Sequence, residues 1–279
     1  MIKPHNTTLN DDELSDNELS DDELALYARQ ILLDEWGLKA QLRLKHANVL
    51  VVGVGGLGCP ALETLVRAGV GHLLLIDDDK VQLSNLQRQS LFYPDDIGKP
   101  KAQTACVTLK KTNPYVEIHA ICQRLDDGLA HQLFAHSATH ADNRFDVILD
   151  CSDNFATRRL LNQLSVKHNI PLLSASAIAM NGQLALFEPA KNTGCYHCIF
   201  GHTTPIEQTC ATSGVLASTP AFMGQLQANV ALQFLGRGIN PLANKLLLCD
   251  GQRMKIQAIS YHKQASCDVC GSVFADVPL

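Results

Sequence analysis

Two pairs of cysteines have the spacing of a metal-binding site. Cys195 and Cys198 enclose two residues, and Cys267 and Cys270 repeat that spacing near the end of the 279-residue chain. Each pair offers two adjacent thiolates, and together they complete the tetrahedral four-sulfur set that Zn²⁺ adopts in structural sites. Because no protein position is left open for water, such an ion is expected to be structural rather than catalytic. Two unrelated pairs, or a redox dithiol, are the alternatives.

A glycine-rich loop follows the apolar run 49–52. Its glycines are Gly53, Gly55, Gly56 and Gly58. Glycine has no Cβ, so the backbone can turn sharply and lie against a phosphate group. Asp77 comes nineteen residues after Gly58, close to the ~20 typical of the acid that binds ribose hydroxyls in a Rossmann unit. No Gly-Lys-Ser/Thr follows the loop, which excludes a P-loop.

Polar residues suited to a triphosphate follow Asp77 along the chain. They are Asp79, Ser84, Asn85, Arg88, Gln89 and Lys101, joined after a later apolar run by Asp153 and Asn154. A triphosphate carries more charge than a dinucleotide and needs cations and a metal ion to bind it. The same residues are also typical of a polar surface turn, and Asp153 precedes a predicted helix, where Asp is a favoured N-cap.

Alternating apolar runs and amphipathic segments predict the elements that position these residues. Strands are expected at 49–52, 73–76, 147–149, 172–173 and 183–187, and helices at 58–67, 101–111, from 155, and at 219–235, where Gly236 would end the helix. Strands that alternate with helices across short turns indicate a doubly wound sheet. The predicted fold is α/β: a Rossmann-like, mostly parallel sheet with an antiparallel extension and a four-cysteine zinc site.

The first 22 residues differ from the rest of the chain. Leucine recurs in them every five residues among Asp, Glu and Ser, a period of neither a helix nor a strand, which predicts a disordered acidic tail. The capping-box spacing of Ser20 and Glu23 predicts that a helix begins here. Residues 23–279 contain no linker and are expected to form one nucleotide-binding domain.

Charge and hydropathy exclude several classes of protein. The net charge is −7 through Leu24 and therefore +2 over the remaining residues, which does not suit a nucleic-acid surface. No apolar run reaches the ~18 residues of a membrane span, and the acidic start does not resemble a secretion signal. The cytoplasm is the expected compartment, where Cys-x-x-Cys pairs more often bind metal than form disulfides.

These motifs, in this order, resemble the ThiF/MoeB/HesA family of adenylating enzymes, which also includes the ubiquitin-activating enzymes. The matching residues are the segment 27–30, the loop 53–58, the segment 84–89, Lys101, the segment 151–154, the pair Thr209 and Cys210, and both cysteine pairs. The resemblance spans residues 23–271, nearly everything except the tail.

The resemblance implies a role for each predicted site residue. Gly56 and its neighbours, with Asp77, would hold the adenosine end of ATP. Asn85, Arg88 and Lys101 would bind phosphates, Asp153 would hold Mg²⁺, and Asn154 would cap the helix in its place. Arg29 would reach across a homodimer interface into the partner's nucleotide site. Arginine suits phosphate because its forked charge is permanent, and a carboxylate suits a hard cation.

The resemblance also implies a reaction and its partners. The enzyme would adenylate the C-terminal Gly-Gly carboxylate of a ubiquitin-like sulfur-carrier protein of thiamine or molybdopterin biosynthesis. Cys210 is either an inert loop thiol or a nucleophile in the later transfer of sulfur. Because the chain ends soon after Cys270, the sulfur is expected to come from another protein, such as a cysteine desulfurase or a rhodanese.

Two other functions are compatible with parts of the sequence. An NAD-dependent oxidoreductase with a structural zinc accounts for the glycine loop and Asp77 but leaves Arg29, Arg88, Lys101 and Asp153 without a role. An inactive scaffold that binds a carrier is the second alternative. Inactive partner subunits tend to lose phosphate-binding residues, and this chain keeps them.

Overall fold

The computed structural model describes residues 19–139, 144–201 and 214–271, and they form a single eight-stranded sheet. Its strand order is β3-β2-β1-β4-β5-β6-β7-β8. The strands are β1 (Asn48–Val52), β2 (His72–Ile76), β3 (Glu117–Ile121), β4 (Val147–Asp150), β5 (Leu172–Ile178), β6 (Asn181–Phe187), β7 (Lys245–Asp250) and β8 (Lys255–Ser260). The predicted α/β architecture is therefore confirmed.

The first five strands in this order are parallel to one another. β1 pairs with β2 on one side and with β4 on the other. Parallel strands of this kind are covered by helices on both faces, which is why β1 and β4 read as continuous apolar runs and are buried along most of their length. The chain changes direction across the sheet between β1 and β4, and such a switch point is where open α/β sheets bind ligands.

The last three strands form the antiparallel extension. β6 pairs with β5 over seven residues, from Leu172 opposite Phe187 to Ile178 opposite Asn181. β7 and β8 continue the sheet as a hairpin, and every residue of β8 is exposed. The extension therefore ends in an open edge strand.

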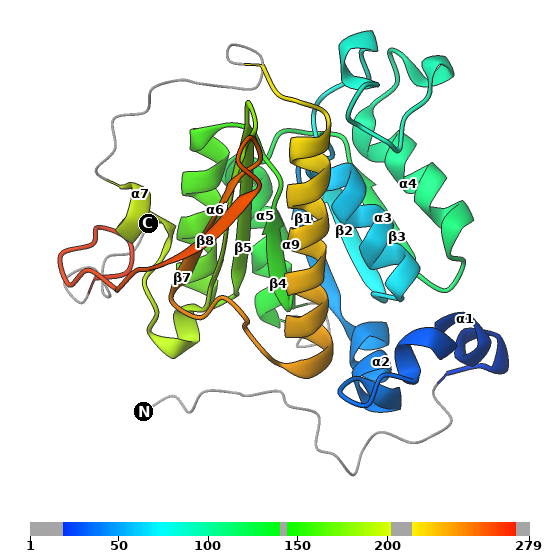
Figure 1. Ribbon diagram of the computed structural model, residues 1–279, viewed down its shortest axis with the longest axis horizontal. Coiled ribbons are helices and arrows are strands. Elements are labelled where there is room, and N and C mark those ends of the chain that lie inside the picture. Colours follow the sequence, from blue (N-terminus) through cyan, green and yellow to red (C-terminus); the bar gives the residue numbers. More distant parts are fainter. Residues whose placement is uncertain (1–18, 140–143, 202–213, 272–279) are drawn as a thin grey trace.

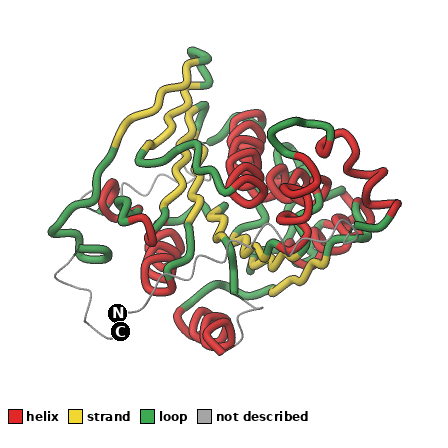
Figure 2. Tube along the Cα trace, turned by 90° about the horizontal axis from the view of Figure 1, so that it is seen from below, coloured by secondary structure: helices red, strands yellow, loops and turns green. Residues whose placement is uncertain are grey.

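Helices cover both faces of the sheet (Figures 1 and 2). They are α1 (Asp21–Ile31), α2 (Gly37–His46), α3 (Gly58–Ala68), α4 (Lys101–Thr112), α5 (Asp127–Thr139), α6 (Phe155–His168), α7 (Tyr196–Phe200) and α9 (Ser218–Arg237). One core lies under α3, α4 and α9, and a second lies under α5, α6 and α7. The sequence patterns do not predict α2, α5, α7, β3, β7 or β8.

Helix α1 begins as the capping-box spacing predicts. The side chain of Ser20 accepts a hydrogen bond from the backbone of Glu23, and the Glu23 carboxylate accepts one from the backbone of Ser20 at 2.9 Å. Leu19, just before the cap, is buried. Most of the predicted tail, residues 1–18, lies outside the described residues. Among the helices that the structure describes, none is long and apolar enough to cross a membrane.

Helix α9 extends beyond its predicted end. It continues through Gly236 to Arg237, and Gly238 ends it in the left-handed conformation with φ of 69°. A Cβ on Gly236 would lie 2.7 Å from the ring of Trp36. The prediction that Gly236 ends the helix was wrong, because this glycine allows α9 to pack closely against Trp36.

Gln227 joins α9 to the centre of the sheet. Its side chain is fully buried, and its amide nitrogen donates to the carbonyl of Asp150 at 3.0 Å and to that of Leu173 at 2.9 Å. These carbonyls belong to β4 and β5. The amide therefore satisfies two buried acceptors of neighbouring strands.

We expect Gln227→Leu to lower the free energy of unfolding by at least about 2 kcal/mol, because an unsatisfied buried acceptor costs about 1–3 kcal/mol. Urea unfolding measures the change. Gln225→Leu, on the exposed face of the same helix, is the matched control and should cost less than about 1 kcal/mol. Equal losses in the two variants would contradict this account of Gln227.

Candidate functional site

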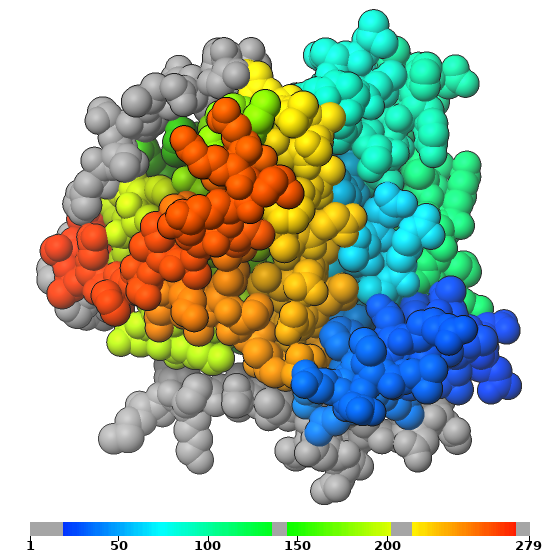
Figure 3. Space-filling model, in the orientation of Figure 1, coloured from blue at the N-terminus to red at the C-terminus, as the bar shows by residue number. Residues whose placement is uncertain are grey.

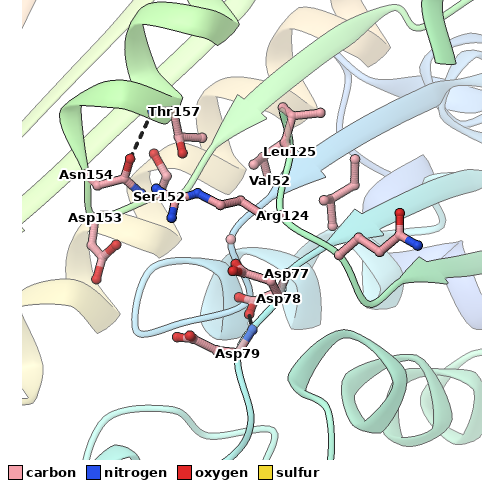
Figure 4. Close-up of a pocket in the computed structure, with 13 residues that line it drawn as sticks. Val52, Asp77, Asp78, Asp79, Arg124, Leu125, Ser152, Asp153, Asn154 and Thr157 are labelled. Carbon is pink, nitrogen blue, oxygen red and sulfur yellow. Dashed lines mark hydrogen bonds between the residues drawn. The ribbon is translucent and has the colours of Figure 1, made fainter. Parts of the chain in front are cut away.

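A cavity of about 800 Å³ opens at the carboxyl edge of the sheet, a size typical of ligand sites. The predicted site residues that line it are Gly53, Gly55, Gly56, Asp77, Asp79, Ser84, Asn85, Arg88, Gln89, Lys101, Asp153 and Asn154. A second hollow of about 260 Å³ adjoins it around Asp77 and Asp153 (Figure 4). The structure thus brings together residues that lie up to 101 positions apart in the sequence. In the space-filling view of Figure 3, the start of α9 (yellow) lies beside the segment that follows β2 (cyan).

The four loop glycines have two different uses. A Cβ on Gly58 would lie 2.1 Å from the carbonyl oxygen of Gly53, and a Cβ on Gly53 would lie 2.6 Å from that of Cys151. These two glycines are needed for close packing. At Gly55 the nearest atom to such a Cβ is a side-chain nitrogen 3.6 Å away, so the loop there faces the open cavity. The N-terminus of α3 follows, and its dipole favours an anion.

Asp77 connects the glycine loop to the end of β2. One oxygen accepts the backbone N–H of Val54 at 2.7 Å, and the other accepts that of Asp79 at 2.9 Å. Burial raises the pKa of Asp77 above its usual value, and these hydrogen bonds partly oppose that effect. The carboxylate therefore fixes the loop and still borders both hollows, where ribose hydroxyls could reach it.

Lys101 is buried in the cavity wall beside an exposed acid. Its side chain is 7% exposed, and its ammonium lies 2.6 Å from the carboxylate of Asp79, which is 67% exposed. The backbone N–H of Lys101 also donates to the carbonyl of Asp79 at 2.9 Å. As the first residue of α4, Lys101 is thus held at a fixed place in the wall.

The segment 84–89 contributes a second cation and a buried amide. Arg88 donates from its guanidinium to the carbonyl of Ser84 at 2.9 Å. The side chain of Gln89 is buried, and its carbonyl oxygen has no hydrogen-bond partner among the described groups. A buried acceptor of this kind costs free energy unless a donor meets it, and Gln89 lines the cavity. This fits a site that binds a ligand or ordered water.

Asn154, rather than Asp153, caps helix α6. Its side-chain oxygen accepts the backbone N–H of Thr157 at 2.9 Å, as the dashed line in Figure 4 shows. The Asp153 carboxylate is exposed on the cavity wall. The two residues thereby divide the roles that the sequence left open, and Asp153 is available for a cation.

Two further arginines border the site. Arg124 extends from the loop after β3 toward the segment 152–154 (Figure 4). Arg158, in the first turns of α6, donates to the carbonyls of Ser152 at 2.7 Å and Ala175 at 3.1 Å, and lies 3.9 Å from the fully buried Asp150. Neither arginine was predicted from the sequence. For Arg124, the available sequence signal was a polar segment after a half-apolar strand. For Arg158, it was an arginine four residues after the helix cap Asn154.

Two of the predicted residues that the structure describes, Arg29 and Gly58, do not line the cavity. Arg29 is exposed on α1, and Figure 1 shows α1 at the opposite end of the sheet from the start of α9, where the cavity opens. Arg29 therefore does not enter the cavity of its own chain. Cys210 lies outside the described residues. Gly58 is buried behind the loop and does not line the cavity.

The four predicted cysteines come together. The sulfur atoms of Cys195, Cys198, Cys267 and Cys270 all lie within 4.8 Å of one another, and three of the residues are buried. Sulfur separations are 3.7 Å between Cys195 and Cys267 and 3.4 Å between Cys198 and Cys270. A hydrogen bond from Cys270 holds the pKa of Cys195 below its usual value, which favours the thiolate form that binds metal. The cluster can hold a metal ion.

The other described cysteines divide into two groups. Cys59, Cys106, Cys151 and Cys249 are buried, and burial raises the pKa of Cys59 to about 12, which suits small hydrophobic residues. Cys122 is exposed just after β3.

Fold and cavity define a Rossmann-like nucleotide-binding protein with a separate four-cysteine cluster. Residues 27–269 match the model of the ThiF family. The chain belongs to this family, which confirms the resemblance seen in the sequence.

Individual relatives support the assignment. Sulfur carrier protein ThiS adenylyltransferase of Escherichia coli is 42% identical over 90% of this chain and 96% of that protein. The SAMP-activating enzyme E1 of Haloferax volcanii is 38% identical over 88% of each chain. Adenylyltransferase and sulfurtransferase MOCS3 of Drosophila sechellia is 40% identical over 96% of this chain, which spans 55% of that protein.

Solved structures give the same fold. The crystal structure of E. coli MccB with ATP is 27% identical and has a TM-score of 0.71, over 84% of this chain and 69% of that one.

We expect Asn154→Ala to lower the free energy of unfolding by about 0.5–2 kcal/mol, the usual cost of losing an N-cap. Asp153→Ala should change it by no more than about 0.5 kcal/mol, because that carboxylate is exposed and does not cap the helix. Urea unfolding of both variants, without nucleotide or added Mg²⁺, measures the difference. A larger loss in the Asp153 variant would reverse the two roles.

Proposed function

We propose that this protein uses ATP to adenylate the C-terminal carboxylate of a ubiquitin-like sulfur-carrier protein that ends in Gly-Gly. One observation supports this above the others: a single cavity contains the glycine loop, three cationic side chains and the exposed carboxylate of Asp153. The names of the E. coli and H. volcanii relatives indicate the same class of reaction.

Each part of ATP has a group of residues to bind it. The hollow between Asp77, Arg124 and Leu125 suits the adenosine, with Asp77 on the ribose. Asn85, Arg88 and Lys101, with the backbone of the glycine loop, suit the phosphates. Asp153 would hold Mg²⁺, which would neutralise phosphate charge. On arrival of ATP, Lys101 would exchange part of its contact with Asp79 for a phosphate oxygen.

The reaction needs alignment and charge stabilisation more than proton transfer. A C-terminal carboxylate is ionised at neutral pH, so it can attack the α-phosphate without a general base. The bond between the α-phosphate and the pyrophosphate breaks as the acyl–phosphate bond forms. Arg88 and Lys101 would stabilise the charge that develops on the phosphates.

The cysteine cluster is proposed to hold a structural zinc ion. Four sulfur ligands around Zn²⁺ at about 2.3 Å lie about 3.8 Å apart, and the separations of 3.4, 3.7 and 3.9 Å match that spacing. The ion would join α7 to the segment 267–270, 72 residues further along the chain. It would stabilise the fold and take no part in the chemistry.

The remaining features concern partners. In a homodimer, Arg29 would reach the partner's cavity. This is compatible with its position on α1, because Arg29 does not enter the cavity of its own chain. Cys210 would act in sulfur transfer after adenylation, with a cysteine desulfurase or a rhodanese as the source of sulfur and the cytoplasm as the compartment. The thiamine and molybdopterin pathways remain equal alternatives, because relatives named for ThiS and MOCS3 are 42% and 40% identical.

Replacing either phosphate-binding cation should impair pyrophosphate exchange into ATP. We expect Arg88→Ala and Lys101→Ala each to lower the rate by about 10²–10³-fold, the effect of removing one stabilising donor. Arg67→Ala and Lys99→Ala, both at exposed ion pairs, are the matched controls and should retain the wild-type rate. Exchange is measured with candidate Gly-Gly-ended carriers. The same assay is repeated for Asp153→Ala, and this variant should lose exchange while zinc stays bound.

Full exchange in the Arg88 or Asp153 variant would refute the assignment of the site. Protection from thermal unfolding by NAD, without any effect of ATP, would instead favour the oxidoreductase. A carrier that binds without being adenylated would indicate the scaffold.

The purified protein should contain one zinc ion per chain. We expect Cys267→Ser to lose the ion and to lower the thermal midpoint, because the metal joins distant segments of the chain. Metal content is measured by elemental analysis, with Cys249→Ser as the control, since Cys249 is buried away from the cluster. Stoichiometric zinc in the Cys267 variant would contradict the proposed ligand set.

A further inference from the structure

The first of the two residues between Cys195 and Cys198 lies on the wall of the cavity. Tyr196 follows Cys195 directly, begins α7, and lines the end of the cavity that is formed by the antiparallel extension. We call this end the sheet end. Its lining residues are Ser176, Ala177, Gln183, Tyr196, Phe200 and Val215. The phosphate-binding residues lie at the opposite end, on the loops after β1, β2 and β4.

The sheet end has little free space beside Tyr196. A hollow of about 10 Å³ that is open to the surface is bordered by Tyr196, Phe200, Arg158 and residues of β5 and β6. That volume accommodates about one water molecule. A side chain that pressed against Tyr196 would therefore meet a ring that already packs against Phe200 and Phe187.

Tyr196 is held in place by packing and by hydrogen bonds. Its ring is buried, with centroid distances of 4.6 Å to Phe200 and 6.3 Å to Phe187. Its backbone N–H donates to Asn162 at 3.0 Å, and the amide nitrogen of Asn162 lies 3.6 Å from the sulfur of Cys195. Since Cys195 and Cys198 flank the residue, the position of the ring depends on the cysteine cluster.

We infer that the carrier tail lies along the sheet end, because the phosphate-binding residues leave this part of the cavity for it. Glycine has no Cβ, so an extended Gly-Gly tail can lie against the Tyr196 ring. A side chain on either of the last two residues would have to displace the ring or the strand opposite it.

We propose that Tyr196 determines which C-terminal residues the carrier can have, and that the metal-bound cysteine cluster positions it for this role. The inference rests on the proposed adenylation and adds a specificity-determining residue to it. The metal site thus has a consequence for substrate binding, although no metal-bound group takes part in the reaction.

The test compares carriers that end in Gly-Gly, Ala-Gly and Gly-Ala. With the wild-type protein, we expect at least one alanine-containing terminus to lower kcat/KM for pyrophosphate exchange by about 10- to 200-fold, the range for one misplaced methylene. Tyr196→Ala should reduce that discrimination at least fivefold and keep measurable exchange with the Gly-Gly carrier. Tyr196→Leu and Phe200→Ala provide milder variants if Tyr196→Ala does not fold.

Tyr261→Ala is the matched control. Tyr261 is also buried and contacts Phe187 at 5.6 Å, but it does not line the cavity. It should leave the discrimination at the wild-type level. Equal relaxation in the Tyr196 and Tyr261 variants would mean that general loosening, rather than the ring itself, changes specificity, and would overturn the proposal.

A binding measurement tests the link to the metal. Removing zinc with a chelator, and then restoring Mg²⁺, should weaken binding of the Gly-Gly carrier at least tenfold by calorimetry, while the Kd for ATP stays within about twofold. Unchanged carrier affinity would overturn the positioning role. If no carrier supports exchange with the wild-type protein, the proposed function fails as well, whereas exchange with unaltered discrimination in Tyr196→Ala refutes this inference alone.

Discussion

The site depends on the close approach of two strand ends. Where β1 ends, Gly53 lies against the carbonyl of Cys151 at the end of β4, so closely that a Cβ on Gly53 would lie 2.6 Å from that oxygen. Any side chain at Gly53 would separate the two strands at the edge where the cavity opens. Because β1 and β4 are direct neighbours in the sheet, this contact sets the distance between the glycine loop and Asp153.

Hydrogen bonds extend the constraint to both sides of the switch point. On one side, Asp77 accepts the backbone N–H of Val54 and so ties the loop to β2. On the other side, Asp150 is fully buried and accepts from the hydroxyl groups of Ser152 and Ser174, at 2.5 and 2.6 Å. A buried carboxylate is tolerated when it is well hydrogen-bonded. Side chains of β2, β4 and β5 therefore hold the polar edge rigid before any ligand arrives.

Strong local patterns in the sequence predicted a large part of the site. The glycine loop and Asp77 come directly after apolar runs, and the two cysteine pairs are recognisable from their spacing even though 72 residues separate the sulfur atoms that meet. Each of these signals depends on neighbouring residues in the chain, which is why their identities and their grouping could be predicted.

The missed residues depend on contacts that local patterns do not reveal. Arg124 follows β3, in which polar residues interrupt the apolar ones, so neither the strand nor its carboxyl end was predicted. Arg158 looks like an ordinary helix charge until α6 packs on β5 and places its guanidinium on two backbone carbonyls. The mistaken helix end at Gly236 has the same origin, because the glycine serves a contact with Trp36, which lies 200 residues earlier in the chain.

The arrangement of charge explains how one cavity can accept two anions that must react. The triphosphate and the carrier carboxylate repel each other, so cations have to lie between or around them for the attack to occur. Arg88 and Lys101 lie on the β1–β2 side of the cavity, and Arg158 lies on the β4–β5 side. Asp79 and Asp150 hold Lys101 and Arg158 in these places. Asp79 and Asp150 thus keep the two cations oriented before a ligand binds. The triphosphate and the carrier carboxylate then neutralise the positive charge that remains.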